Sequence, residues 1–189
     1  MSKLKLFGTT SHSFIQAAPT SSGETFTLPG EGASNPGLGG MYLSTPQSAN
    51  SASILFTDVP VWAKKITIMF QGVGMSVSTA DIRIRLGTSG GIISTGYLSS
   101  SSNQAGTVTS AVTYFHIDNL GTAQTNSGHY IITKFDSSTY IGSGVQKHAG
   151  TALRYSAGEL TGVSGTIDRV EISAANAYNA GQINVLYEG

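Results

Sequence analysis

Histidine is the side chain that most often binds metal ions and transfers protons near neutral pH. The chain has four histidines, His12, His116, His129 and His148, and no cysteine. Metal sites commonly place two ligands at short spacing, such as the first and fifth positions of a helical turn. No two of these histidines are that close, so we expect no metal site and a hydrogen-bonded structural role for each.

Carboxylates offer a second route to catalysis, because a glycosidase uses two of them as acid, base or nucleophile. Four could pair in principle: Asp118, Asp136, Glu159 and Asp168. Spacing alone does not pair them, and Asp118 and Asp136 precede Asn119 and Ser137 in a pattern typical of turn caps. A glycan depolymerase that uses a carboxylate pair is therefore the enzymatic alternative to a non-enzymatic function.

Two short motifs contain serine between glycines. Gly142-Ser-Gly144 is interpreted as a turn, because no acid and base accompany it as they would in a hydrolase. The run from Gly87 to Gly91 lacks the lysine and the helix that a phosphate-binding loop requires. We therefore expect no catalytic residues, no cofactor and no enzymatic activity.

Sugar-binding surfaces combine aromatic rings with short polar side chains on loops. Five residues of this kind lie at predicted strand ends or in predicted loops: Tyr97, Tyr140, His148, Asn176 and Tyr178. They are the candidate ligand-binding residues. The alternative for each is a place in the core, since tyrosine also fills the interior of β-sandwiches.

The charge composition excludes several partners. Lys plus Arg and Asp plus Glu number ten each, and charged residues make up 11% of the 189 residues. A neutral chain without a basic run lacks the electrostatic term that drives nucleic-acid binding. The apolar residues that follow Met1 are too few for a signal peptide or a membrane span, so we expect no membrane insertion.

Residues 61–72 predict the strand around which the chain is organised, because Ile66 and Ile68 alternate with polar residues. Two runs near the carboxyl end, residues 165–172 and 182–187, alternate in the same way. We expect these three runs to form the centre of one antiparallel sheet. Residues 81–86 place Ile82, Ile84 and Leu86 on a buried face and the densest charge on the other, and a hairpin with residues 61–72 is the simplest topology.

Further strands are predicted at residues 13–17, 24–28, 53–56, 91–98, 107–117, 129–135, 140–145 and 151–155, with loops such as 99–106 and 119–128. Their spacing, without any segment of helical period, predicts an all-β fold, an antiparallel β-sandwich that is jelly-roll-like. Residues 1–50 are rich in Gly, Ser, Thr and Pro and predict an extended N-terminal arm. Residues 51–189 are assigned to the sandwich domain.

The carboxyl-terminal third carries the sequences Gly165-Thr-Ile-Asp-Arg-Val-Glu-Ile172 and Ala180-Gly-Gln-Ile-Asn-Val-Leu-Tyr-Glu188. These two motifs, together with the strand from Trp62 to Gly72, resemble the carboxyl-terminal β-sandwich domain of tailed-phage fibre and other virion proteins. The resemblance covers residues 60–189 well and the arm weakly. It supports a virion setting more than a particular role.

The resemblance implies a phage virion structural protein located on the tail fibre, spike or capsid surface. It implies a homotrimer whose arm contacts other virion proteins and whose domain binds a host-surface glycan or receptor. The absence of a heptad or triple-helical shaft favours a short fibre or spike. The alternative is a capsid decoration protein that ties shell subunits together.

Overall fold

The structure is a computed structural model that describes residues 40–75, 80–148 and 152–189 in full and only the backbone of residues 3–7 and 12–16. The described part contains no helix, and the all-β prediction is confirmed. The strands are β1 (Lys3–Phe7), β2 (His12–Gln16), β3 (Met41–Leu43), β4 (Gln47–Ser48), β5 (Ser53–Phe56), β6 (Lys65–Met75), β7 (Ala80–Thr88), β8 (Gly91–Ile92), β9 (Tyr97–Asn103), β10 (Val108–Ala111), β11 (Phe115–Leu120), β12 (Thr125–Lys134), β13 (Tyr140–His148), β14 (Ala152–Leu160), β15 (Arg169–Ser173) and β16 (Tyr178–Glu188).

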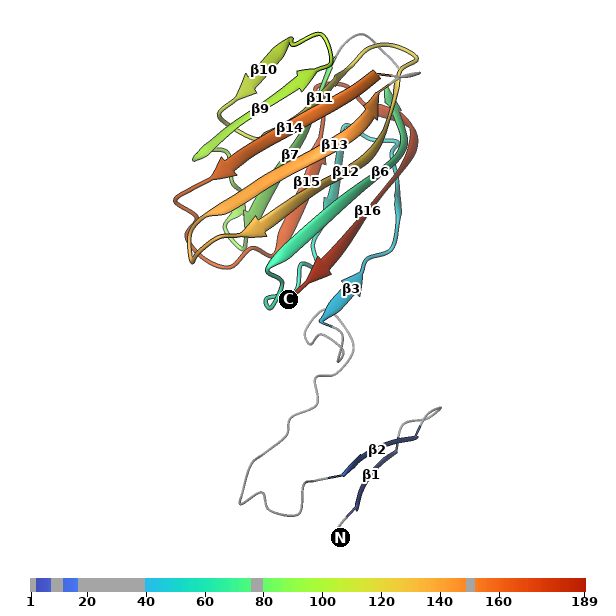
Figure 1. The fold of residues 1–189 in the computed structure, drawn as a ribbon, viewed down its shortest axis with the longest axis vertical. Coiled ribbons are helices and arrows are strands. Elements are labelled where there is room, and N and C mark those ends of the chain that lie inside the picture. The colour runs from blue at the N-terminus through green and yellow to red at the C-terminus, as the bar shows by residue number, and fades with distance from the viewer. Residues whose placement is uncertain (1–2, 8–11, 17–39, 76–79, 149–151) are drawn as a thin grey trace.

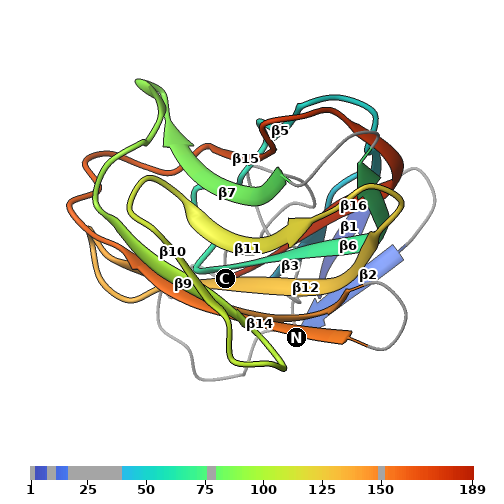
Figure 2. The same cartoon turned by 90° about the horizontal axis from the view of Figure 1, so that it is seen from above.

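Two antiparallel sheets pack face to face as a sandwich (Figure 1 and Figure 2). The nine-stranded sheet has the order β10-β9-β14-β13-β12-β6-β16-β3, and β4 also pairs with β16. The five-stranded sheet has the order β11-β7-β15-β5, with β8 paired to β7. Among the described strands, β1 and β2 pair only with each other.

Eight connections carry the chain from one sheet to the other, which makes the fold jelly-roll-like. Four of them, β5 to β6, β8 to β9, β10 to β11 and β14 to β15, lie toward one end of the sandwich, and the other four lie at the opposite end. These other four join β4 to β5, β6 to β7, β11 to β12 and β15 to β16. As a result the order β12-β6-β16-β4 in one sheet matches the order β11-β7-β15-β5 in the other. These last four connections lie at the end of the sandwich that we call the crossover end (Figure 1).

The opposite end, called the terminal end, holds the carboxyl terminus and the first fully described residue. The backbone N of Gly189 donates a hydrogen bond to the carbonyl O of Gly40 at 3.0 Å. Strand β3, which follows Gly40, lies beside the carboxyl terminus in Figure 1. The N-terminal segment therefore joins the sandwich at the end opposite the crossover end.

The predicted hairpin between residues 61–72 and 81–86 was wrong. Strand β6 pairs with β12 and β16 in the nine-stranded sheet, whereas β7 pairs with β11 and β15 in the five-stranded sheet. The predicted central sheet was correct for β6 and β16 but not for β15, which lies in the other sheet. Alternation shows that one face of a strand is buried, but it does not show which sheet the strand joins.

Several predicted boundaries also differ from the structure. The predicted strand at 91–98 is two strands, β8 and β9, in different sheets, and the predicted strand at 107–117 is likewise β10 and β11. The predicted loops at 99–106 and 119–128 are largely strand. Strands β3 and β4 fall in the predicted arm but pair with β16, so the sandwich begins at β3 rather than at residue 51.

Strand β2 agrees with the strand predicted at 13–17, and β5 agrees with the strand predicted at 53–56. The strand predicted at 24–28 lies outside the described residues. The alternation of β7 is confirmed, since Ile82, Ile84 and Leu86 are fully buried and the residues between them are partly exposed.

The interior divides into two regions. Between β6, β16, β7 and β15 it is a packed apolar core of the kind that stabilises sandwiches. Its fully buried residues include Ile68, Val73, Ile82, Ile84, Leu86, Val170, Ile172, Ile183, Val185 and Tyr187. Between β11 and the strands β9, β13 and β14, the interior contains apolar side chains such as Phe115, Ile117 and Leu160. Toward the crossover end it also contains glycine, serine and hydrogen-bonded polar residues.

Candidate functional site

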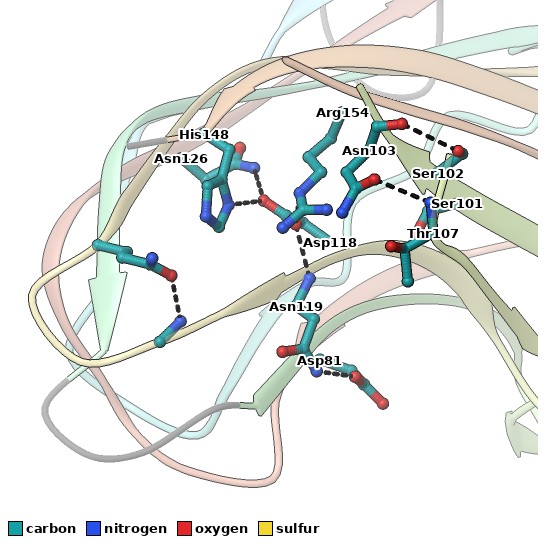
Figure 3. A network of polar contacts seen from close by, with 12 residues as sticks. Asp81, Ser101, Ser102, Asn103, Thr107, Asp118, Asn119, Asn126, His148 and Arg154 are labelled. Carbon is teal, nitrogen blue, oxygen red and sulfur yellow. Dashed lines mark hydrogen bonds and ion pairs between the residues drawn. The ribbon is translucent and has the colours of Figure 1, made fainter. Parts of the chain in front are cut away.

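A cluster of polar side chains is buried between the two sheets near the crossover end (Figure 3). Its centre is the carboxylate of Asp118 on β11, which is fully buried. This carboxylate accepts hydrogen bonds from Nδ2 of Asn126 at 2.8 Å and from the backbone N of Asn119 at 2.7 Å. Its oxygens also lie 2.7 Å from Nδ1 of His148 and 2.9 Å from Nε of Arg154. We call these residues the Asp118 cluster.

The Asp118 cluster joins one strand of the five-stranded sheet to three neighbouring strands of the other. Asn126, His148 and Arg154 belong to β12, β13 and β14, and all three lie where their strands meet the crossover end. A buried carboxylate is stable only when it is paired and hydrogen-bonded. The arrangement therefore fixes the ends of three strands.

Asn119 extends the network to a second carboxylate, Asp81 on β7 (Figure 3). Its Nδ2 donates to Oδ1 of Asp81 at 2.8 Å, and the hydroxyl of Tyr114 donates to Oδ2 at 3.0 Å. Partial burial acts to raise the pKa of Asp81, but hydrogen bonds from Asn119, His116 and Tyr114 together outweigh it and hold the pKa below its usual value. Arg83 forms an ion pair with the same carboxylate, and its guanidinium nitrogen lies 3.6 Å from Oδ2 of Asp81.

A serine, a histidine and an aspartate lie in series beside this network. Oγ of Ser101 lies 2.7 Å from Nδ1 of His116, and Nε2 of the same ring lies 3.2 Å from Oδ1 of Asp81. In serine hydrolases the carboxylate holds Nδ1 and the serine faces Nε2, so this ring is turned the other way. Ser101 and His116 are also buried. The series therefore supports a structural link between β9 and β11 rather than nucleophilic catalysis.

Ser99 satisfies the free backbone edge of β11. Strand β11 pairs with β7 on one side, and no described strand pairs with it on the other. Oγ of Ser99 accepts a hydrogen bond from the backbone N of His116 at 3.0 Å and donates to the carbonyl of Tyr114 at 2.7 Å. Unpaired backbone groups inside a protein are costly. Ser99 therefore takes the place of a neighbouring strand at this point of the edge.

Glycines make room for the network. Gly142 and Gly144 lie inside β13, so the interpretation of these residues as a turn was wrong. A Cβ atom at Gly142 would lie 2.5 Å from the ring of Tyr130, and one at Gly144 would lie 2.8 Å from the same ring. The ring of Tyr130 therefore packs flat on β13 only because these two positions have no side chain.

The five candidate ligand-binding residues do not form one surface. Four of them are buried, with exposed fractions of 4% for Tyr97, 6% for Tyr140, 5% for His148 and 1% for Tyr178. Tyr97 and Tyr140 lie near each other at the terminal end, and the other three lie at the crossover end. Asn176 alone is partly exposed. The four buried residues are core residues that cannot stack on a ligand in this structure.

The two expected turn caps have different outcomes. Oδ1 of Asp136 accepts hydrogen bonds from the backbone N and Oγ of Ser138 at 2.7 and 3.3 Å, so Asp136 does cap its turn. Asp118 does not cap a turn, because it lies within β11 and is buried. Asn126 and Arg154 were missed, and the burial of Asp118 was not expected, because a buried polar side chain gives no periodic signal in a strand.

Within the described ranges, no group of three or more His, Asp or Glu side chains lies close enough together to hold a metal ion. The same ranges include no helix that is long and apolar enough to cross a membrane. In comparisons with protein-family models, curated proteins and solved structures, the chain has no match.

Proposed function

We propose that this chain is a non-enzymatic surface protein of a phage virion that binds a host-surface glycan or receptor. In this proposal the N-terminal segment attaches the chain to the particle and the crossover end points outward. The observation that carries it is the polarity of the sandwich. Gly40 lies at the terminal end beside Gly189, so the N-terminal segment joins the sandwich there and the crossover end is the end away from this attachment.

The Asp118 cluster supports the choice of the crossover end as the binding end. Loops that bind ligands work best when a rigid scaffold positions them, because less entropy is then lost on binding. Asp118, His148 and Arg154 lie near the crossover end and tie the two sheets together there. The network would hold the loops in one arrangement without taking part in the contact.

The strand motifs of the carboxyl-terminal third support the virion setting. Residues 165–172 and 180–188 resemble the corresponding strands of phage fibre domains, and they form β15 and β16 with the preceding turn. Both strands lie in the apolar core. The resemblance therefore bears on the fold and the setting, while the binding role rests on the polarity of the sandwich.

The test compares binding of the labelled full-length chain to bacterial cells that the phage infects. Ala105 is exposed in the turn between β9 and β10 at the crossover end, and Ser137 is exposed in the turn between β12 and β13 at the terminal end. We expect Ala105→Arg to weaken saturable cell binding at least tenfold. Ser137→Arg, the matched control, should change it less than twofold. Equal effects, or no saturable binding by the unmodified chain, would contradict the proposal.

Capsid decoration is the second candidate, and one groove favours it. At the β3 edge of the nine-stranded sheet, Leu43, Pro46, Met69 and Leu186 line an apolar groove of about 450 Å³. A neighbouring shell subunit could fill it with an apolar side chain. Decoration predicts that the chain binds purified shells and does not bind cells. Measuring binding to shells and to cells therefore separates the two candidates.

A further inference from the structure

The outward face of the nine-stranded sheet carries several exposed apolar side chains among short polar ones. Along β13 and β14 its residues are Ile141, Ser143, Val145, Lys147, Leu153, Tyr155, Ala157 and Glu159. Ile141 is 47% exposed, Tyr155 is 46% exposed, and Leu98 on the adjoining strand β9 is 61% exposed. Several exposed apolar side chains gathered on one sheet face favour an interaction surface.

The outward face of the five-stranded sheet is different. There Arg85 forms an ion pair with Glu171 at 2.7 Å, and Arg83 lies 3.6 Å from Asp81. Among the described strands, Leu55 is the one large exposed apolar residue of that sheet. The two faces of the sandwich thus differ in chemistry, and the face of the nine-stranded sheet is the one suited to burial.

The charges on the apolar face are arranged symmetrically about its centre. Lys147 pairs in register with Leu153 near the crossover end, and Glu159 pairs with Ile141 near the terminal end. The two charges are six residues apart along the strands, or about 20 Å. Neither forms an ion pair with another described residue. Lys65 and Glu188, the other charged residues on this face, pair with each other at 2.8 Å.

We propose that this face binds the same face of a second copy of the chain. A two-fold axis in the plane of the interface and perpendicular to the strands reverses the strand direction. It therefore places the crossover end of one copy over the terminal end of the other. In this arrangement Lys147 of each copy meets Glu159 of the other, and Val145 and Tyr155 lie at the centre of the contact.

The size and the charge of the face fit a second copy of the chain as the partner. Five strands, from β6 to β9, span about 24 Å, and seven residues along each strand span about 23 Å. Two such faces bury about 1,100 Å² in total, just above the roughly 1,000 Å² expected for a specific interface. The face carries one free positive and one free negative charge, which suits self-association and gives no attraction for a highly charged polymer.

This inference concerns the free chain in solution, because the two crossover ends of such a dimer point in opposite directions and do not both face outward from one particle. It is tested on the purified full-length chain. A two-fold contact uses one patch against itself, whereas the expected homotrimer would join two different patches. The mass in solution therefore separates the two arrangements.

The experiment exchanges charges and measures mass by light scattering at micromolar concentrations. Lys147→Glu sets two carboxylates opposite each other in the contact, and Glu159→Lys sets two ammonium groups opposite each other, so each variant repels itself. We expect each change to raise the dissociation constant of the dimer at least tenfold. An equimolar mixture of the two variants should restore the dimer, because both contacts are then between opposite charges. Lys134→Glu, an exposed change outside the face, is the control and should have no effect.

A Tyr155→Ser variant tests the apolar centre of the contact independently of charge and should also raise the dissociation constant. Circular dichroism would show that the exposed substitutions leave the fold intact. A monomer at all concentrations, a trimer mass, or a mixture of the two charge variants that stays monomeric would each overturn the proposal.

Discussion

Asp118 and Arg154 face each other across the sandwich, with Nε of the arginine 2.9 Å from Oδ1 of the aspartate. Asp118 belongs to β11 in the five-stranded sheet and Arg154 to β14 in the nine-stranded sheet. Most links between the two sheets are apolar contacts, which tolerate small shifts. Separating two buried opposite charges is costly, so this ion pair favours one alignment of the sheets at the crossover end.

Removing the charge of Asp118 should be strongly destabilising. Asp118→Asn keeps the size of the side chain but leaves Arg154 without a buried counter-charge. We expect the free energy of unfolding to fall by about 3–5 kcal/mol. Urea denaturation measures this through the fluorescence of Trp62, the one tryptophan of the chain.

Asp58→Asn is the control for the Asp118 substitution. Asp58 is exposed and accepts a hydrogen bond from the hydroxyl of Tyr42 at 3.0 Å. Its substitution should change the free energy of unfolding by less than about 1 kcal/mol. Similar losses in the two variants would contradict a special role for the Asp118 cluster.

Gly142→Ala should destabilise the sandwich because the added methyl group would collide with the ring of Tyr130. The distance from the ideal Cβ to Cε1 of that ring is 2.5 Å. We expect a loss of about 2 kcal/mol, typical of an overpacked interior. At Gly90, a Cβ would meet only Oγ1 of Thr88 at 3.5 Å. Gly90→Ala is therefore the control, and an equally large loss there would contradict the packing argument.

The stability contributed by Asp81 should depend on pH. Its pKa is lower in the folded chain than in the unfolded chain, where carboxyl groups have a pKa of about 3.9. Below that pH the unfolded chain binds the proton more readily than the folded chain does, so protonation favours unfolding. The stability is therefore present above about pH 4 and is lost as the pH falls through the lower folded value.

Comparing Asp81→Asn with the unmodified chain isolates this effect. The free energy of unfolding, measured by urea denaturation, should differ between the two proteins at pH 7. The difference should shrink as the pH is lowered to about 3. A difference that stays constant over this range would show that the ionised form of Asp81 is not what the network stabilises.

At high pH the buried tyrosines should limit stability. Burial raises the pKa of Tyr130 and of Tyr178 well above the value of about 10 found in unfolded chains. Above about pH 10 the unfolded chain loses these protons first, so the free energy of unfolding falls as the pH rises. An ultraviolet titration should show the buried tyrosines ionising only as the fold is lost. Ionisation of all eight tyrosines in one step with the fold intact would contradict this.

The strands themselves could be predicted from the sequence, because alternation reports burial of one face. Ile82, Ile84 and Leu86 illustrate this, since their alternation with charged residues matches the buried and outward positions of β7. The sheet that a strand joins could not be predicted. The connection from β6 to β7 is short enough for a hairpin, yet it crosses between sheets, and nothing local in the sequence distinguishes the two.

The polar interior could not be predicted for a related reason. Ser99 and Ser101 belong to a run of serines that is typical of a surface loop, but their hydroxyls bind the edge of β11. Asp118 likewise has the residue type of a turn cap, and its burial depends on Arg154, which lies far away in sequence. Partners that compensate a buried polar group appear only when the fold brings them together.

The most direct test of the proposed function is immunogold electron microscopy of intact phage particles, with an antibody raised against the folded full-length chain. The account predicts label at the tail or fibre tips of particles that carry the chain. Label spread over the head would favour decoration over adhesion. Particles that carry no label anywhere, while the purified chain is labelled under the same conditions, would contradict the proposal that this is a virion protein.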